Sequence, residues 1–221
     1  MSFKKILLLP HLCIHNSNAL SSPFTIGFPA MTAWLGATHA LQRKLLEYGV
    51  SINCNSTGVV SHQLDLQTYR GENDYVSSII STGNPLNKSG ERSAFIEEAR
   101  CHLDVSLLIE IDGVSQEQEE TLIERVAHLL NTKIKMAGGD IQSFKAPVIH
   151  VLENNNEADL RKLTRDIMPG YVLVERRDLM VEAMEQGQDA MDAMLDYLAI
   201  HHSCTQDDEG EVTWTSHRKS Q

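Results

Sequence analysis

The sequence predicts an α+β fold with a ferredoxin-like βαββαβ core, an inserted segment and a smaller C-terminal α/β extension. Apolar residues alternate with period two in some segments and recur with helical spacing in others. These segments follow one another as β-α-β, insertion, β-α-β. A split βαβ order of this kind packs two helices on one face of an antiparallel sheet, so the other face can remain free for a ligand.

The first β-α-β unit starts near the beginning of the chain. Residues 4–14 form an apolar run that is typical of a buried strand. Residues 29–48 have a proline near the first turn, leucines at helical spacing and a glycine just past the end, which predicts a helix. Two candidate strands follow at residues 50–53 and 58–66.

An insertion at residues 67–100 separates the two units. It is rich in glycine, asparagine and serine up to residue 90 and has a short helical piece around residues 94–100. Insertions of this length inside a compact domain are more often functional than not. With this insertion included, we expect the ferredoxin-like domain to span residues 1–145.

The second unit repeats the pattern. Residues 101–111 alternate as a strand, and residues 115–130 form a predicted helix. Ser115 followed three residues later by Gln118 matches a capping box. Residues 133–136 return as a strand.

The remaining residues, 146–221, are predicted to form an α/β extension that is incomplete. Its expected elements are strands at residues 147–152 and 170–175, helices at residues 157–167 and 179–199, and the start of a strand at residues 212–215. Gly187 is a weak point in the second of these helices.

Composition excludes some classes of protein. The chain has 221 residues, and its apolar runs are far shorter than the roughly 18 residues that a membrane span needs. No signal peptide fits the first residues, so we expect a cytoplasmic protein without membrane contact. The four cysteines show no paired spacing, which argues against a zinc ribbon or a disulfide framework. Neither a metal ion nor a cofactor is expected.

The net charge of −11 has the wrong sign for broad phosphate neutralisation. Its distribution is uneven, because residues 1–96 hold seven Lys or Arg against five Asp or Glu. A nucleic-acid surface is therefore expected in the first half. The acidic remainder is either a solvated face or a surface shaped for a basic partner.

Histidines mark one face of the first strand. His11, Cys13 and His15 lie on one side, and Leu12 and Ile14 on the other. Such a face could hold a metal, but the sequence supplies no carboxylate or fourth ligand locally. It could supply a general acid or base for metal-independent RNA cleavage, or be simply a polar open face. RNA-recognition modules use such a face with stacking aromatic residues, which are absent here.

Three segments carry the candidate binding residues. A small polar loop joins the first strand to the first helix, and its amide and hydroxyl side chains suit phosphate, ribose or base edges, although a capped loop explains them too. A Gly-Gly pair allows close backbone approach or a turn. The insertion carries a locally basic tip. The candidates in these segments are Asn16, Asn18, Ser21 and Ser22, then Gly138 and Gly139, then Arg70, Lys88 and Arg92.

A long run of the sequence resembles a known family. Residues 8–44, LLPHLCIHNSNALSSPFTIGFPAMTAWLGATHALQRK, are similar to the N-terminal signature of the second subunit of the type I-F CRISPR Csy surveillance complex. The resemblance continues almost to the end of the chain, through residues 84–86, 96–109, 136–139, 168–174, 177–179, 210–214 and 218–219. Members of that family usually extend further, so the chain is expected to lack the C-terminal part.

The resemblance implies a repeat-associated (RAMP) protein that binds and caps the 5-prime handle of a CRISPR RNA without catalysis. Its implied partners are this RNA, the large subunit, the backbone subunit and, through the complex, target DNA. Residues 67–92 would be the thumb that presses on RNA. Two alternatives stay open, namely a RAMP-type endoribonuclease that processes repeat RNA and a protein scaffold without RNA contact.

Overall fold

A computed structural model describes most of the chain, namely residues 3–22, 25–80, 86–91, 98–153, 156–199, 201–206 and 211–217. The chain is divided into two compact units, Met1–Leu173 and Val174–Gln221. The predicted boundary between residues 145 and 146 falls inside the first unit, because later strands still join its sheet.

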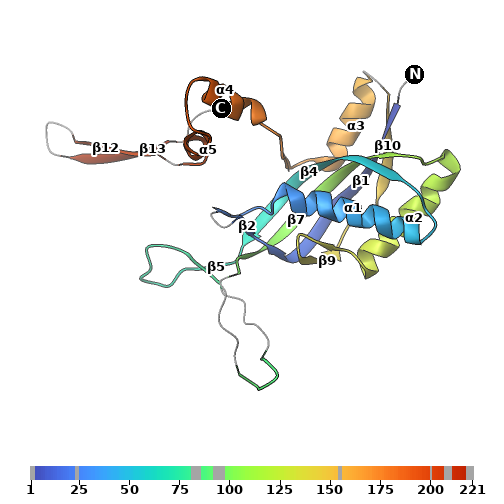
Figure 1. The fold of residues 1–221 in the computed structure, drawn as a ribbon, viewed down its shortest axis with the longest axis horizontal. Helices are drawn as coiled ribbons and strands as arrows, with labels where there is room; N and C mark the ends of the chain where they lie inside the picture. Colours follow the sequence, from blue (N-terminus) through green and yellow to red (C-terminus); the bar gives the residue numbers. More distant parts are fainter. Residues whose placement is uncertain are drawn as a thin grey trace. The chain divides into compact units, whose positions relative to one another are not determined.

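An antiparallel sheet dominates the first unit (Figure 1). Its strands are β1 (Phe3–Asn18), β4 (Asn53–Leu66), β7 (Arg100–Asp112), β8 (Lys135–Met136), β9 (Gly139–Ser143), β10 (Val148–Glu153) and β11 (Tyr171–Val172). They are ordered β11-β4-β7-β1-β9-β8, and β10 also pairs with β1. Strand β10 pairs with the first part of β1 and β9 with a later part. The α+β class predicted from the sequence is therefore confirmed.

The helices of this unit are α1 (Met31–Glu47), α2 (Glu119–Thr132) and α3 (Glu157–Ile167). A 3₁₀ turn, η1 (Gln116–Gln118), precedes α2, and the capping box of Ser115 and Gln118 is confirmed in front of it. Two small ladders lie outside the main sheet, β2 (Leu20–Ser22) with β3 (Thr25–Ile26) and β5 (Thr68–Tyr69) with β6 (Ser78–Ile79).

Some predicted elements differ from those observed. In place of the two strands expected at residues 50–53 and 58–66 there is one strand, β4, which begins at Asn53 and pairs with β7 along its length, while residues 50–52 lie outside it. The helical piece expected around residues 94–100 falls mostly outside the described residues, and Arg100 already begins β7. Long-range pairing to a central strand explains the first difference, because it extends β4 through polar positions that look like a break in the sequence.

A β-bulge in β1 changes which of its residues face the helices. Between Leu9 and Leu12 strand β1 gains one residue over β7, and His11 there has a φ of 49°. The bulge shifts the alternation, so Leu12 joins Leu7 and Leu9 in the core under the helices. Helices α1 and α2 pack on this face, and Trp34 of α1 is fully buried in the same core.

The second face is covered only in part. Helix α3 packs on β10 and buries Leu163 and His150. Past α3, the chain crosses beside β4, where Pro169 and Gly170 lie against His62. Strand β11 then pairs with β4. The part of the face near the end of β1 keeps its exposed polar side chains.

The second unit contains α4 (Arg177–Glu185), α5 (Ala190–Leu198) and a hairpin of β12 (His201–Gln206) and β13 (Val212–His217). The single helix expected at residues 179–199 is split at Gly187, which has a φ of 90°. The strand start expected at residues 212–215 finds its partner in β12. In the described part of the chain, no helix combines the length and apolar character that crossing a membrane requires.

Candidate functional site

A cavity of about 540 Å³ lies beside the first half of α1. Three candidate residues that are distant in sequence, Asn18, Ser21 and Gly138, line it together. The rest of the lining consists mainly of small side chains of α1 and its N-terminal approach, with one cation from β8. These lining residues are Leu20, Pro29, Ala30, Thr32, Ala33, Gly36, Ala37, Ala40, Lys135 and Ala137.

The loop that leads into α1 is held by its own hydrogen bonds. Asn18 Oδ1 accepts a hydrogen bond from the backbone N–H of Leu20 at 3.0 Å, and the hydroxyls of Ser21 and Ser22 lie 2.9 and 2.7 Å from Thr25 Oγ1. Helix α1 begins after Ala30 without a side-chain cap and with no acidic residue in its first turn. The positive end of its dipole is therefore not neutralised locally.

The four polar loop residues do not form one group. Asn18 and Ser21 line the cavity, whereas Ser22 does not appear in its lining. Asn16, with a φ of 57°, donates its backbone N–H to His102 Nδ1 at 3.2 Å and therefore contacts the open face of the sheet. Because the bulge after Ile14 separates them, the two asparagines serve different surfaces.

The two glycines also differ. Gly138 has a φ of 77° and lines the cavity, and a Cβ at this position would lie 3.9 Å from Asn18 Cβ. Gly139 is buried in the sheet, where a Cβ would lie 2.6 Å from His15 O and 2.8 Å from Ile14 Cγ2. Gly139 is therefore needed for the close packing of β9 against β1, which is a structural reason for the Gly-Gly pair.

The basic candidates of the insertion lie outside the cavity lining. Arg70 is exposed and donates from Nε to the carbonyl of Asp74 at 2.9 Å, which closes a local turn. Lys88 is exposed in the stretch 86–91, whose turn is built around Asn87. Arg92 falls outside the described residues. Their assignment to RNA binding remains a prediction.

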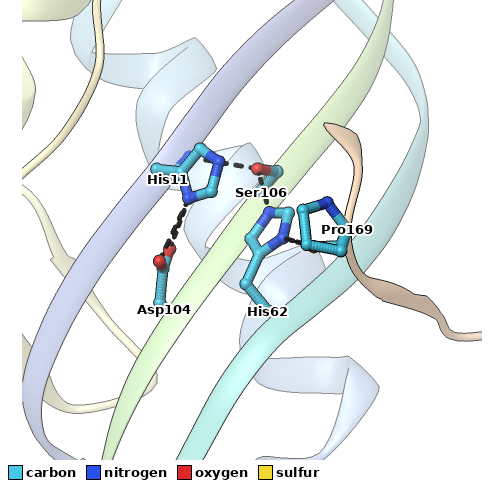
Figure 2. Close-up of polar contacts among 5 residues, drawn as sticks. All are labelled: His11, His62, Asp104, Ser106 and Pro169. Carbon is cyan, nitrogen blue, oxygen red and sulfur yellow. Dashed lines mark hydrogen bonds and ion pairs between the residues drawn. The ribbon is translucent and has the colours of Figure 1, made fainter. Parts of the chain in front are cut away.

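A polar cluster on the open face joins three neighbouring strands (Figure 2). His11 Nδ1 of β1 lies 3.0 Å from Asp104 Oδ2 of β7. The His11 ring stacks on His62 of β4, with centroids 4.1 Å apart and planes at 20°. The sequence next to His11 supplies no carboxylate, and β7 supplies Asp104 across the strand pairing instead.

Hydrogen bonds fix the tautomer of His62. Its Nδ1 lies 2.6 Å from the carbonyl oxygen of Pro169, which can only accept, so Nδ1 carries the proton. Its Nε2 lies 2.6 Å from Ser106 Oγ and accepts that hydroxyl when the imidazole is neutral. Ser106 Oγ in turn accepts the backbone N–H of His11 at 3.0 Å. This chain fastens the segment around Pro169 to the sheet.

The cluster is poorly arranged for metal binding or nucleophilic catalysis. Ligand atoms of His11, His62 and Asp104 lie within 4.8 Å of one another, but both nitrogens of His62 are already engaged. Nearly parallel rings also direct their lone pairs side by side rather than toward one ion. Ser106, although paired with His62, has no exposed surface and cannot reach a substrate.

A second imidazole pair lies further along the same face. The rings of His15 and His102 are 4.5 Å apart, beside a cavity of about 290 Å³ that Gln63 and Asp65 also line. Because His102 Nδ1 accepts the N–H of Asn16, its Nε2 carries the proton in the neutral ring. The side-chain nitrogen of Gln67 lies 3.0 Å from His102 Nε2 and donates to Asn16 Oδ1 at 2.9 Å. The predicted open binding face is thus an ordered polar network.

Comparison with known proteins adds independent information. A family described as CRISPR-associated protein (Cas_Csy2) matches residues 7–221. The CRISPR-associated protein Csy2 of Pseudomonas aeruginosa (strain UCBPP-PA14) is 34% identical to this chain over 216 residues. The alignment covers 89% of this chain and 65% of the relative, so the chain spans just under two thirds of that relative's length. The cavity and the open-face network both lie within the region matched by the family.

Proposed function

Because the chain belongs to the CRISPR-associated Csy2 family, we propose that it is a non-catalytic subunit of a type I-F Csy surveillance complex that caps the 5-prime handle of the guide RNA. Family membership confirms the resemblance seen in residues 8–44 and beyond. The capping role is the finer part of the proposal and depends on the cavity beside α1.

The observation that carries the proposal is the convergence of Asn18, Ser21 and Gly138 on one cavity. An amide, a hydroxyl and an exposed backbone turn offer the donors and acceptors that read phosphate, ribose and base edges. The uncapped start of α1 adds backbone N–H groups, and Lys135 adds a cation at the rim. Small side chains such as those of Ala33 and Gly36 leave room for the ligand backbone.

The absence of catalysis is proposed from the open-face cluster. Metal-independent RNA cleavage needs an acid and a base that reach the ribose hydroxyl and the leaving oxygen. His62 has both ring nitrogens in hydrogen bonds, and the buried Ser106 is inaccessible. His11 is oriented by Asp104 but stacks on His62. These contacts support a structural role for the histidines.

The strand order supports the ferredoxin-like part of the proposal. The run β4-β7-β1-β9, with α1 after β1 and α2 after β7, is the order that a split βαβ core requires. In the proposed complex, the large subunit and the backbone subunit are the protein partners, and target DNA is reached through the assembly in the cytoplasm. The acidic surface of the chain, with a net charge of −11, suits basic partners.

The test fills the cavity without removing a polar group. Gly36 lies on α1, and a Cβ at this position would meet nothing within 4 Å, so Gly36→Leu should fold normally and place its side chain at the cavity. We expect guide-RNA binding by the chain, purified with its large-subunit partner, to weaken at least about tenfold. His39→Leu, at an exposed α1 position outside the lining, is the matched control and should bind as wild type does.

Two results would overturn the proposal. If Gly36→Leu and Asn18→Ala both retain wild-type RNA affinity while remaining folded, the cavity is not the RNA site. If the pure wild-type chain cleaves repeat RNA and His11→Ala abolishes the cleavage, the subunit is a nuclease instead.

A further inference from the structure

Tyr48, at the C-terminal end of α1, gathers a group of basic side chains from α2 and the residue after it. The Lys133 ammonium lies 5.1 Å from the centre of the Tyr48 ring, and the Arg125 guanidinium carbon lies 5.8 Å from it. His128 meets the ring edge-on with centroids 6.0 Å apart. The aromatic ring thus holds two cations close together, which cation–π attraction allows despite their mutual repulsion.

Neither of these two cations is paired with a carboxylate among the described residues. In the same part of the chain, seven other lysine or arginine side chains form such ion pairs. Glu47 acts on Lys133 from a distance but is paired with Lys44 at 3.0 Å. A hydrogen bond to Tyr48 raises the pKa of Lys133, which keeps it charged. Arg125 and Lys133 therefore form a positive site that no ion pair in the described part of the chain neutralises.

The site is continuous with the cavity beside α1. Lys133 and Lys135 are exposed, whereas Ile134 and Met136 between and after them are buried. Lys133 caps the end of α2 and Lys135 begins β8, so their Cα atoms, two residues apart in the chain, are at most about 7 Å apart. Lys135 also lines the cavity and pairs with Asp140 at 2.9 Å. One exposed segment therefore leads from the cavity to Tyr48.

We propose that Arg125, Lys133 and Lys135 form a cation strip that binds the phosphates of the single-stranded RNA where it leaves the cavity and continues along α1. This inference rests on the proposed function and adds the path that the RNA takes after it leaves the cavity. Arg125 and Lys133 supply the unneutralised charge, and Lys135 links them to the cavity. Phosphates are the fitting ligand, because the ring of Tyr48 is already occupied by the cations and is not free to stack on a base.

The test is a salt titration of binding to a fluorescein-labelled single-stranded RNA that carries the repeat-derived 5-prime sequence of the same CRISPR locus. The protein is the chain in complex with its large-subunit partner, as wild type and as the double variant Arg125→Gln and Lys133→Gln. Each phosphate contact on a single strand contributes about −0.7 to the slope of log K against log salt, so the variant's slope should be shallower by about 1.4. The ratio of the wild-type affinity to the variant affinity should then fall about sevenfold between about 50 and 200 mM salt.

The control variant removes two cations elsewhere. Lys145 and Lys162 are exposed and form no ion pair among the described residues, so Lys145→Gln with Lys162→Gln changes the net charge equally. This control should keep the wild-type slope. Equal slopes for wild type and the strip variant, or the same change in the control, would contradict the proposal that the strip binds phosphates. Neither result would contradict the proposal that the cavity binds RNA. A wild-type complex that does not bind the RNA overturns both.

Discussion

The two faces of the main sheet differ in chemistry, because one is apolar and the other is polar and hydrogen-bonded. On the face under α1 and α2, β1 and β7 present apolar side chains apart from the buried Ser17, and Trp34 closes the core with no exposed surface. On the other face, the same strands present His11, Asp104 and Ser106, which are satisfied by hydrogen bonds. Apolar burial needs contact area, whereas polar burial needs a partner for each group.

The two faces also differ in which of their residues a ligand could reach. Two helices pack tightly on the apolar face and leave its central residues inaccessible. The cavity and the cation strip lie at the margin of this helical layer, where α1 meets β8 and the loop after β1. The polar face is ordered by its own contacts and fastens the segment that follows α3.

The largest expected effect tests the apolar face. Trp34→Ala should lower the free energy of unfolding by about 3–5 kcal/mol, because it leaves a cavity in a fully buried site. Urea denaturation followed by circular dichroism measures the loss. Leu35→Ala, at the next residue with 48% exposure, should change stability by less than about 1 kcal/mol. Equal losses for the two variants would contradict the assignment of the core.

A smaller effect is expected on the polar face. His62→Phe keeps a ring beside His11 but leaves the Ser106 hydroxyl and the Pro169 carbonyl without their partner. Leaving such groups unpaired should cost about 1–3 kcal/mol in the same denaturation experiment. His39→Phe on exposed α1 is the control. A neutral His62→Phe variant would show that the network does not fasten the segment.

The smallest expected effect concerns His150, which is buried under α3. Its Nε2 lies 3.2 Å from Asp166 Oδ2 but makes no hydrogen bond in this orientation. Burial lowers the pKa of His150, and Lys162 adds to this, while Asp166 opposes it. The unfolded chain, with a histidine pKa of about 6.5, therefore binds the proton first as the pH falls.

The contribution of His150 to stability is consequently complete above about pH 6.5 and is lost as the pH falls toward its lowered folded-state pKa. Urea midpoints at about pH 7.5 and 5.5 should differ less in His150→Phe than in wild type. A pH dependence unchanged by the substitution would assign the effect to other groups.

Local patterns in the sequence predicted much of the fold. Alternation placed His11, Cys13 and His15 opposite Leu12 and Ile14, and the capping box located the start of the second helix. The helix predicted at residues 157–167 is α3 with the same bounds. Such features depend on neighbours within a few residues, so periodicity and capping chemistry suffice to predict them.

The tertiary structure alone decided which distant residues meet. Register and bulges bring His11 beside Asp104 and His62, and they separate Asn16 from Asn18. The cavity joins Asn18 to Gly138 only because β9 and β8 pack beside β1 and α1. A shift of one residue in strand pairing would move each of these side chains to the opposite face, and no local pattern in the sequence fixes that pairing.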